Sequence, residues 1–450
     1  MQQILDLHIH SKYSRACSKQ LELEQIARTC EIKGVDIIAT GDFTFPKWFD
    51  AIKDLTPSPP PYKGEGSSGL YQLPNSKTKF ILSTELALIY KQDSGHANKG
   101  GVNHARRLHI VVLAPNLKAV EKFNKYLDSH GFNIKSDGRP ILGMSAIELC
   151  KILFNIDEKF MVIPAHIWTP WFSIFGSKSG FDGMQECFGE FTKNIYAYET
   201  GLSSDPEMNW RVSELDNFTL LSNSDAHSLP NIAREANVFE MKEISYEAIY
   251  DIIKNSSPNK RANPPKTASG RARSKYGSLL YTIEFYPEEG MYHYDGHRAC
   301  NICLPPKETK KYKDICPKCK KKLTIGVDYR VDELADRERG FRPKGAVDYK
   351  KLVELDKIIA EALDIRSRAS QKVRVEYNNL IKKIQATELD ILINKDLKDL
   401  AKITLPEVVG GIKRVREGNL IVEPGYDGEY GTVKIFSKEE RASNKQAKLF

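Results

Sequence analysis

The chain has 450 residues, of which 41% are hydrophobic and 28% charged, as is ordinary for a soluble protein with a large core in more than one domain. Its 67 Lys and Arg residues exceed the 59 acidic ones by +8, a surplus that favours a polyanionic partner only where the cations cluster. No apolar run is long enough for a membrane span and no leader pattern opens the sequence, so we expect an intracellular, cytoplasmic protein.

Two histidines lie in the first predicted strand, residues 6–10. In an extended segment, side chains two positions apart point to the same face, so His8 and His10 project together. Such a pair binds a metal when carboxylates join it, although two strand histidines can also be surface or satisfied core residues.

Later apolar runs end in side chains that can bind a metal. A helix over residues 21–33, ended by Gly34, precedes the first of these runs. The runs lead to Asp42, Glu85, His166, and the pair Asp225 and His227, while His109 precedes a further apolar run. Strands alternating with helices predict parallel pairing, and in a closed parallel barrel the functional groups gather at the C-terminal strand ends.

Each of these residues taken alone has a structural alternative. Glu85 could be a buried ion-pair partner, His109 a satisfied core histidine, and Asp42 a turn cap. Their joint occurrence at strand ends favours a metal centre. Imidazole and carboxylate together suit zinc, manganese or iron, and a carboxylate such as Glu85 can bridge two ions.

These motifs resemble those of the PHP (polymerase and histidinol phosphatase) family, which folds as a distorted (β/α)7 barrel. The resemblance implies a first metal on His8, His10, Glu85 and Asp225, a second on Glu85, His109 and His166, and part of a third on Asp42 and His227. It implies catalytic roles for Asp225, Glu85, His8 and His227. The loop after His10 departs from the pattern, because Ser14-Arg15-Ala16-Cys17 stands where the family often has a further ligand.

A cluster of this kind serves phosphoester hydrolysis. Two or three divalent ions, Zn²⁺, Mn²⁺ or Mg²⁺, neutralise developing charge and lower the pKa of a bound water from about 16 towards 7. The sequence contains no competing Ser-His-Asp arrangement and no phosphate-binding glycine loop of the Gly-x-x-x-x-Gly-Lys type.

The segment after His166 concentrates aromatic rings beside hydroxyls and a lysine. Aromatic faces stack on unpaired bases for about 1–3 kcal/mol each, although the rings could instead be buried beneath the barrel rim. We expect substrate contacts from Ser11, Lys12, Trp168, Trp171, Phe172, Ser173, Phe175, Ser177, Lys178, Arg271 and Arg273.

Residues 256–280 form a predicted basic linker or arm, and residues 281–340 a zinc-binding domain. Two Cys-x-x-Cys pairs, Cys300 with Cys303 and Cys316 with Cys319, predict a closed four-cysteine Zn²⁺ site of structural type. Eight lysines surround the pairs, so here the positive charge is clustered.

Residues 341–436 predict a helical domain with terminal strands, and residues 437–450 a flexible tail. Gly410 and Gly411 could form a phosphate-gripping hairpin between helices. The tail ends in Gln446, Leu449 and Phe450, which resemble the short peptides that dock on sliding clamps, although a chance match is as frequent.

The predicted fold class is α/β: a distorted (β/α)7 PHP barrel over residues 1–255, then a four-cysteine zinc-ribbon module and a mostly helical C-terminal region. This arrangement resembles the endonuclease Q family of repair nucleases over nearly the whole chain. The resemblance implies a nucleoid-associated enzyme that nicks double-stranded DNA 5′ of deaminated bases (uracil, hypoxanthine) and of abasic sites. The alternatives are a small-molecule phosphatase of the histidinol phosphate type and a catalytically silent nucleic-acid-binding scaffold.

Overall fold

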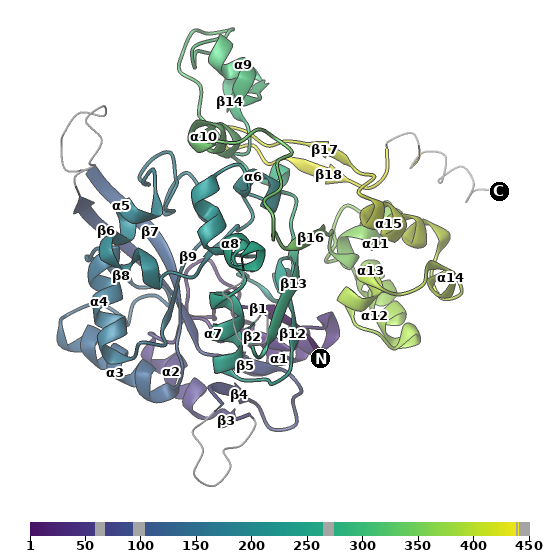
Figure 1. The fold of residues 1–450 in the computed structure, drawn as a ribbon. Helices are drawn as coiled ribbons and strands as arrows, with labels where there is room; N and C mark the ends of the chain where they lie inside the picture. The colour runs from purple at the N-terminus through teal and green to yellow at the C-terminus, as the bar shows by residue number, and fades with distance from the viewer. Residues whose placement is uncertain (59–67, 93–103, 264–273, 438–439, 441–450) are drawn as a thin grey trace.

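The computed structural model describes residues 1–58, 68–92, 104–263, 274–437 and 440 (Figure 1). Over these residues the fold is mixed α/β, with one eight-stranded sheet, one four-stranded sheet and three two-stranded sheets. A large body carries the two big sheets, a small module with β14 and α9 projects from it, and a helical group lies to one side. Among the described helices, none has the length and apolar character needed to cross a membrane.

The strands are β1 Gln2–Asp6, β2 Ile37–Ala39, β3 Thr56–Pro57, β4 Leu70–Gln72, β5 Lys79–Ile81, β6 Ser83–Gln92, β7 His104–Leu113, β8 Ile141–Leu142, β9 Met161–Pro164, β10 Ala197–Glu199, β11 Thr219–Leu221, β12 Ala236–Met241, β13 Gly277–Glu284, β14 Asp295–His297, β15 Ile302–Leu304, β16 Asp348–Lys351, β17 Ile421–Glu423 and β18 Thr432–Lys434. The α-helices are α1 Leu23–Lys33, α2 Pro46–Lys53, α3 Leu117–Ser129, α4 Ala146–Ile156, α5 Met184–Phe188, α6 Pro206–Asn209, α7 Tyr246–Lys254, α8 Pro258–Ala262, α9 Pro306–Lys311, α10 Val327–Leu334, α11 Leu355–Ala362, α12 Gln371–Ile384, α13 Glu388–Ile393, α14 Leu397–Leu400 and α15 Pro406–Glu417.

The pairing of the strands is only partly parallel. In the large sheet, ordered β16-β13-β12-β1-β2-β5-β4-β3, β1–β2 and β2–β5 are parallel, as is β10–β11 elsewhere. The prediction of parallel pairing is wrong for the pairs β6–β7 and β7–β9, which are antiparallel, whereas β6–β8 is parallel. A parallel crossover needs a dozen or more residues and usually a helix, and the connection from β6 to β7 is shorter than that.

Backbone hydrogen bonds beyond the strands bring the strand ends together at one rim. The Ala114 amide donates to the Leu82 carbonyl, and the Ile167 amide donates to the Glu199 carbonyl, both at about 3 Å. The His10 amide donates to the Ala226 carbonyl at 3.1 Å. These bonds join the ends of β5 and β7, of β9 and β10, and of β1 and β11. Together with the pairing of β7 with β9 and of β10 with β11, they bring the side chains near these strand ends into one region.

Helix α1 begins within two residues of the predicted start and ends, as predicted, at Gly34. Gly34 adopts a left-handed φ of 93°, and its amide donates to the Cys30 carbonyl at 2.7 Å. A Cβ on Gly34 would lie 2.4 Å from Oγ1 of Thr387, at the start of α13. The absent side chain therefore both ends the helix and lets the C-terminal helical group approach α1.

The predicted domain boundaries near residue 280 do not follow the sheets. Strand β13 pairs with β12 of the body and with β16, so the boundary at 280–281 falls inside a strand of the large sheet. Of the predicted basic linker, residues 258–262 form α8, whereas Arg271 and Arg273 lie outside the described residues. Their predicted DNA contacts stay predictions.

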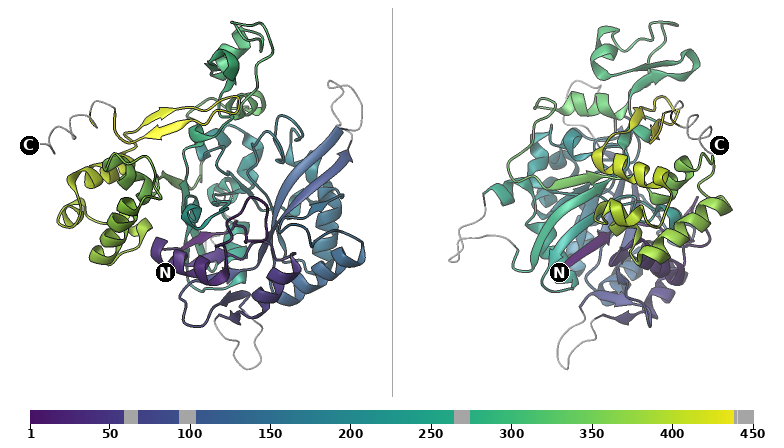
Figure 2. Two further views of the ribbon diagram at one scale, coloured as in Figure 1. Left: turned by 180° about the vertical axis from the view of Figure 1, so that it is seen from behind. Right: turned by 90° about the vertical axis from the view of Figure 1, so that its right-hand side faces the viewer.

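The C-terminal helices form a compact group with a β-hairpin that reaches back to the module (Figures 1 and 2). The prediction of a hairpin at Gly410 and Gly411 is wrong, because both lie inside α15. A Cβ on Gly411 would lie 2.7 Å from Cγ2 of Ile358, so this glycine allows α11 and α15 to pack closely. The predicted clamp-binding residues Gln446, Leu449 and Phe450 lie outside the described residues.

Candidate metal centre

Four buried or nearly buried side chains converge just past β1 and β11 and near the start of β6. The ligand atoms of His8, His10, Glu85 and Asp225 all lie within 4.8 Å of one another. His10 Nε2 is 3.2 Å from Glu85 Oε2 and 3.1 Å from Asp225 Oδ1. The prediction of a strand over residues 6–10 is wrong, because β1 ends at Asp6 and beyond it Ile9 forms only an isolated bridge with Ala226. His8 and His10 nevertheless reach the same group, as their spacing predicts.

A second group shares Glu85 with the first. Glu85 Oε1 is 2.8 Å from His109 Nδ1 and 3.2 Å from His166 Nε2, while its Oε2 faces the first group. Glu85 is 1% exposed, so both of its carboxylate oxygens face groups inside the protein. The two sets are those that the PHP resemblance implies for two metals, and the shared carboxylate is positioned to bridge them.

The chemistry of these atoms fits divalent cations. His8 Nδ1 donates to Glu199 Oε2 at 3.0 Å, which leaves the lone pair of Nε2 directed at the centre. His8 Nε2, His10 Nε2 and Asp225 Oδ1 are buried atoms with no hydrogen-bond partner among the described residues. Buried polar atoms of this kind are costly unless something binds them, and a metal ion satisfies all three at once.

The electrostatics of the centre favour charged carboxylates. Burial by itself would raise the pKa of Glu85, but His109, Arg139 and His8 hold it well below its ordinary value. Burial would likewise lower the pKa of the His8 imidazole, yet the surrounding carboxylates hold that pKa well above 6.5. His109 behaves differently, because burial lowers its pKa to about 4 and keeps it a neutral ligand near pH 7.

Two further carboxylates orient the histidines. Glu199, at the end of β10, accepts hydrogen bonds from His8 Nδ1 and from the Asn223 amide at 3.0 Å, and it is fully buried. Glu199 is absent from the residues that the sequence analysis assigned to the site, so its role as the support of His8 was missed. Such a partner fixes the tautomer and the ring orientation of a ligand histidine.

Asp42 occupies the equivalent position behind His10. Its Oδ1 lies 3.1 Å from His10 Nδ1, and its Oδ2 accepts from the Ser11 amide, Ser11 Oγ and Ser14 Oγ at 2.6–2.8 Å. Neither Asp42 nor His227 belongs to the metal-competent groups of the described residues. Their predicted part in a third metal site stays a prediction, and Ser11, predicted to contact substrate, is instead buried against Asp42.

The backbone is strained where three site residues leave their strands. Asp42, His166 and Asp225 have positive φ values of 48°, 30° and 44°. Left-handed conformations are unfavourable for residues with a Cβ and persist where the surrounding structure holds them, often at functional sites. These backbone conformations direct the side chains of Asp42, His166 and Asp225 toward the same region.

Known proteins resemble this chain in sequence and in structure. Residues 354–419 match the MJ0043 C-terminal domain family. The chain is 32% identical over 272 residues to protein MJ0043 of Methanocaldococcus jannaschii, which is 60% of this chain and 31% of that relative's own length. The crystal structure of the lesion-specific endonuclease PfuEndoQ from Pyrococcus furiosus is similar with a TM-score of 0.78 and 27% identity, covering 98% of this chain and 99% of that one. A structure of endonuclease Q with a 27-mer duplex carrying an abasic lesion at the active site matches at TM-score 0.78 and 28% identity over 98% of each chain.

The chain therefore resembles endonuclease Q over nearly its whole length. In this endonuclease Q homologue, the aromatic segment after His166 divides into buried and exposed residues. Trp168, Ser173 and Phe175 are at most 1% exposed and pack inside the body, so they cannot stack on a base in this conformation. Phe172 lies against the His109 ring, with centroids 4.6 Å apart, and the Phe172 carbonyl accepts from the His109 amide. The predicted substrate contacts are thus replaced by packing and by support of a metal ligand.

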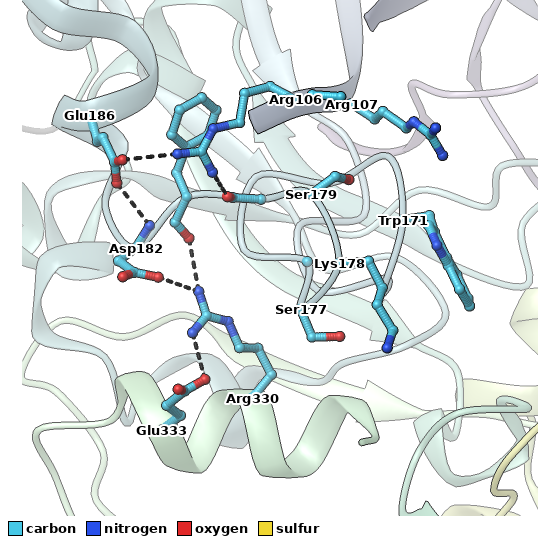
Figure 3. Close-up of a pocket in the computed structure, with 14 residues that line it drawn as sticks. Arg106, Arg107, Trp171, Ser177, Lys178, Ser179, Asp182, Glu186, Arg330 and Glu333 are labelled. Atoms are coloured by element: carbon cyan, nitrogen blue, oxygen red, sulfur yellow. Dashed lines mark hydrogen bonds and ion pairs between the residues drawn. The ribbon is translucent and has the colours of Figure 1, made fainter. Parts of the chain in front are cut away.

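Trp171, by contrast, is 39% exposed and stands between two pockets. One pocket, of about 430 Å³, is lined by Arg106, Arg107, Ser177, Lys178 and Arg330 among others (Figure 3). Figure 3 shows Arg106 paired with Glu186, and Arg330 paired with Asp182 and Glu333. Lys178 and Arg107 form no ion pair with a described residue, and both are therefore available to a phosphate.

The second pocket, of about 390 Å³, is mostly apolar and lies on the other side of Trp171. Tyr292, whose ring meets Trp171 edge-on, and Tyr430 line it together with Arg234. The Arg234 guanidinium donates to the carbonyls of Ser224 and Asp225 at 2.9 and 3.3 Å, so this pocket adjoins the metal centre. Lys12, another predicted contact, pairs with Glu22 at 2.8 Å.

The small module holds a third metal-competent group, which differs from the predicted four cysteines. His297 joins Cys300, Cys316 and Cys319, whose ligand atoms lie within 4.8 Å of one another. Cys303 is not in this group, and its Sγ lies 4.0 Å from the Pro424 carbonyl. His297 was missed, although its position three residues before Cys300 was visible in the sequence. One imidazole and three thiols in this arrangement suit a closed tetrahedral site.

Proposed function

We propose that this endonuclease Q homologue is a metal-dependent DNA endonuclease that nicks a strand 5′ of deaminated bases and of abasic sites. The observation that carries the proposal is the sharing of Glu85 by two buried ligand groups beside an exposed pocket with aromatic walls. The two solved relatives, a lesion-specific endonuclease and a complex with lesion-containing duplex, support DNA hydrolysis as the reaction.

The residues of the centre have different roles in phosphodiester hydrolysis. Divalent ions bound there would lower the pKa of a bound water and neutralise the charge that develops on the phosphate. His8, His10, Glu85 and Asp225 would hold the first ion, and Glu85, His109 and His166 the second. Glu199 and Asp42 keep the two strand histidines in the ligand tautomer. Closely spaced carboxylates and imidazoles thus fix where the phosphate must lie.

We assign recognition of the damaged nucleotide to the pockets beside Trp171. A flipped base needs an apolar pocket with an aromatic wall, and the pocket of Trp171, Tyr292 and Tyr430 offers both next to the centre. The phosphates that flank the base would meet Lys178 and Arg107 in the neighbouring pocket. Flipping costs least where base pairing is already weak, which favours deaminated and abasic sites.

The small module supplies a basic surface for the duplex. All eight of its lysines are exposed: Lys307, Lys310, Lys311, Lys313, Lys318, Lys320, Lys321 and Lys322. Zn²⁺ on His297 and the three cysteines would stabilise this small fold, which has few buried apolar residues of its own. We therefore propose that the module is a structural zinc domain that binds the phosphate backbone of the DNA.

Two further assignments complete the proposal. Strands β1, β2, β5, β7, β9, β10 and β11 follow one another around the body through strand pairs and single hydrogen bonds, and we propose that they form a distorted PHP barrel.

We also keep the prediction that the last residues bind a sliding clamp. Removing residues 447–450 should abolish clamp pull-down without changing cleavage, and unchanged retention would reject it.

A cleavage assay on labelled duplexes tests the function. We expect a nick 5′ of a single deoxyuridine, deoxyinosine or abasic site that requires Mg²⁺, Mn²⁺ or Zn²⁺, is lost with chelator and is absent on undamaged DNA. Asp225→Asn should abolish cleavage while retaining DNA binding. Asp128→Asn is the matched control, because within the described part of the chain this exposed aspartate forms an ion pair only with Lys135. Equal cutting of damaged and undamaged duplexes would reject lesion specificity, and chelator-resistant cutting would reject the metal centre.

A further inference from the structure

An arginine outside the predicted site reaches the bridging carboxylate. Arg139 Nη1 donates to Glu85 Oε2 at 2.9 Å, and no other hydrogen-bond acceptor for this guanidinium is found among the described residues. The Arg139 side chain is 26% exposed, so part of the guanidinium faces solvent at the rim. It has further N–H donors that can bind a phosphate oxygen.

Arg139 stands on the side of the centre where a third cation would otherwise be held. Asp42, the ligand implied for a third metal, has both oxygens committed to His10, Ser11 and Ser14. The Gly138 backbone fills the space beside it, since a Cβ there would lie 2.3 Å from Asp42 Oδ2. A metal at Asp42 would have to displace both the serine hydrogen bonds and this backbone.

The segment that carries Arg139 is anchored on both sides. The Gly138 amide donates to the Tyr13 carbonyl at 3.2 Å, and the Pro140 carbonyl accepts from Ala87, two residues beyond Glu85. Arg15 pairs with Asp137 in the same segment at 3.2 Å. The position of the Arg139 guanidinium against Glu85 is therefore set by backbone contacts of its neighbours as well as by its charge.

We propose that the centre holds two metal ions and that the Arg139 guanidinium supplies the third positive charge, orienting Glu85 and contacting an oxygen of the scissile phosphate. This inference rests on the proposed phosphodiesterase function. A carboxylate oxygen can bind a metal and accept a hydrogen bond together, so the Arg139–Glu85 contact is compatible with a bridging Glu85. The fixed cation would stabilise the charge that grows on the phosphate during attack.

The first test counts metal ions by elemental analysis of the purified full chain, without DNA. We expect three ions per chain, one for each metal-competent group. Arg139→Ala should keep these three or gain a fourth in the vacated space. Four ions in the wild-type chain would overturn the proposal, and so would loss of ions in Arg139→Ala. Because no cleavage is measured, this result is independent of the proposed function.

The second test measures cleavage kinetics of the lesion duplex. Arg139→Ala should lower kcat about 10²-fold, the usual effect of removing one donor to a developing oxyanion. Arg139→Lys, which keeps the charge, should recover part of the loss, and added guanidinium should partly rescue Arg139→Ala. Lys135→Ala, which removes a 68% exposed surface cation that pairs with Asp128 and contacts no residue of the centre, should retain full activity. Equal loss in the Lys and Ala variants, or a loss below threefold, would overturn the role of the charge.

Discussion

Replacing Glu199 with glutamine removes one charge from behind the metal centre while keeping the shape of the side chain. In the structure Glu199 accepts from His8 Nδ1, from the His166 amide and from the Asn223 side-chain amide. Glutamine offers one oxygen where glutamate offers two, and its NH2 group would face a donor. At least one of these hydrogen bonds must therefore be lost in Glu199→Gln.

The size of the effect follows from the role of Glu199. Loss of an outer partner of a ligand histidine weakens metal affinity by about 10- to 100-fold. This corresponds to roughly 1.4–2.8 kcal/mol of binding free energy. Because Glu199 is fully buried, little of the loss is screened by solvent. The effect should fall on the group of His8 and His10 more than on the group of His109.

Competition between the metal-loaded protein and a chelator of known affinity measures the change. Glu284→Gln is the matched control, because Glu284 is also fully buried but touches no metal ligand. We expect this control to keep wild-type affinity, and both variants to keep the wild-type circular dichroism spectrum. Unchanged metal affinity in Glu199→Gln would refute the inference that this carboxylate supports His8.

Three further predictions concern protons and the module. Metal binding should release protons at neutral pH, because the pKa values of His8 and His10 without metal lie well above 6.5. Calorimetry in two buffers of different ionisation enthalpy should therefore give different apparent binding enthalpies. Equal enthalpies would contradict proton release. Burial raises the pKa of Glu284 from 4.5 in the unfolded chain to about 8 in the folded one. Between these two pH values the native state binds more protons than the unfolded state, so the free energy of unfolding should fall as the pH rises from one to the other. Glu284→Gln should flatten that decline in denaturant melts by several kcal/mol, and an unaltered slope would exclude Glu284 as the source. In the module, His297→Ala should lose bound metal while Cys303→Ser keeps it, as metal analysis of the two variants would show; the reverse result would restore the four-cysteine site.

The sequence alone determined the features that depend on local geometry. The two-residue spacing of His8 and His10 predicted that both would reach one site, although β1 ends before them, and the polar residues near buried strands predicted which side chains would meet. Both ligand groups of the centre were expected from these patterns together with the family resemblance, and Gly34 ended α1 as its conformational freedom predicts. The spacing of residues within one strand or one turn can be read from the sequence.

Tertiary structure decided whatever depended on residues far apart in the chain. Glu199 supports His8 across 191 positions, Arg139 reaches Glu85 across 54, and His297 takes the place predicted for Cys303. The rings of Trp168 and Phe175 are buried, whereas that of Trp171 is exposed, although all three lie in one short segment. Hydrogen-bond partners and burial are properties of the packed chain, because a side chain meets its partner only after the strands that carry both have been brought together.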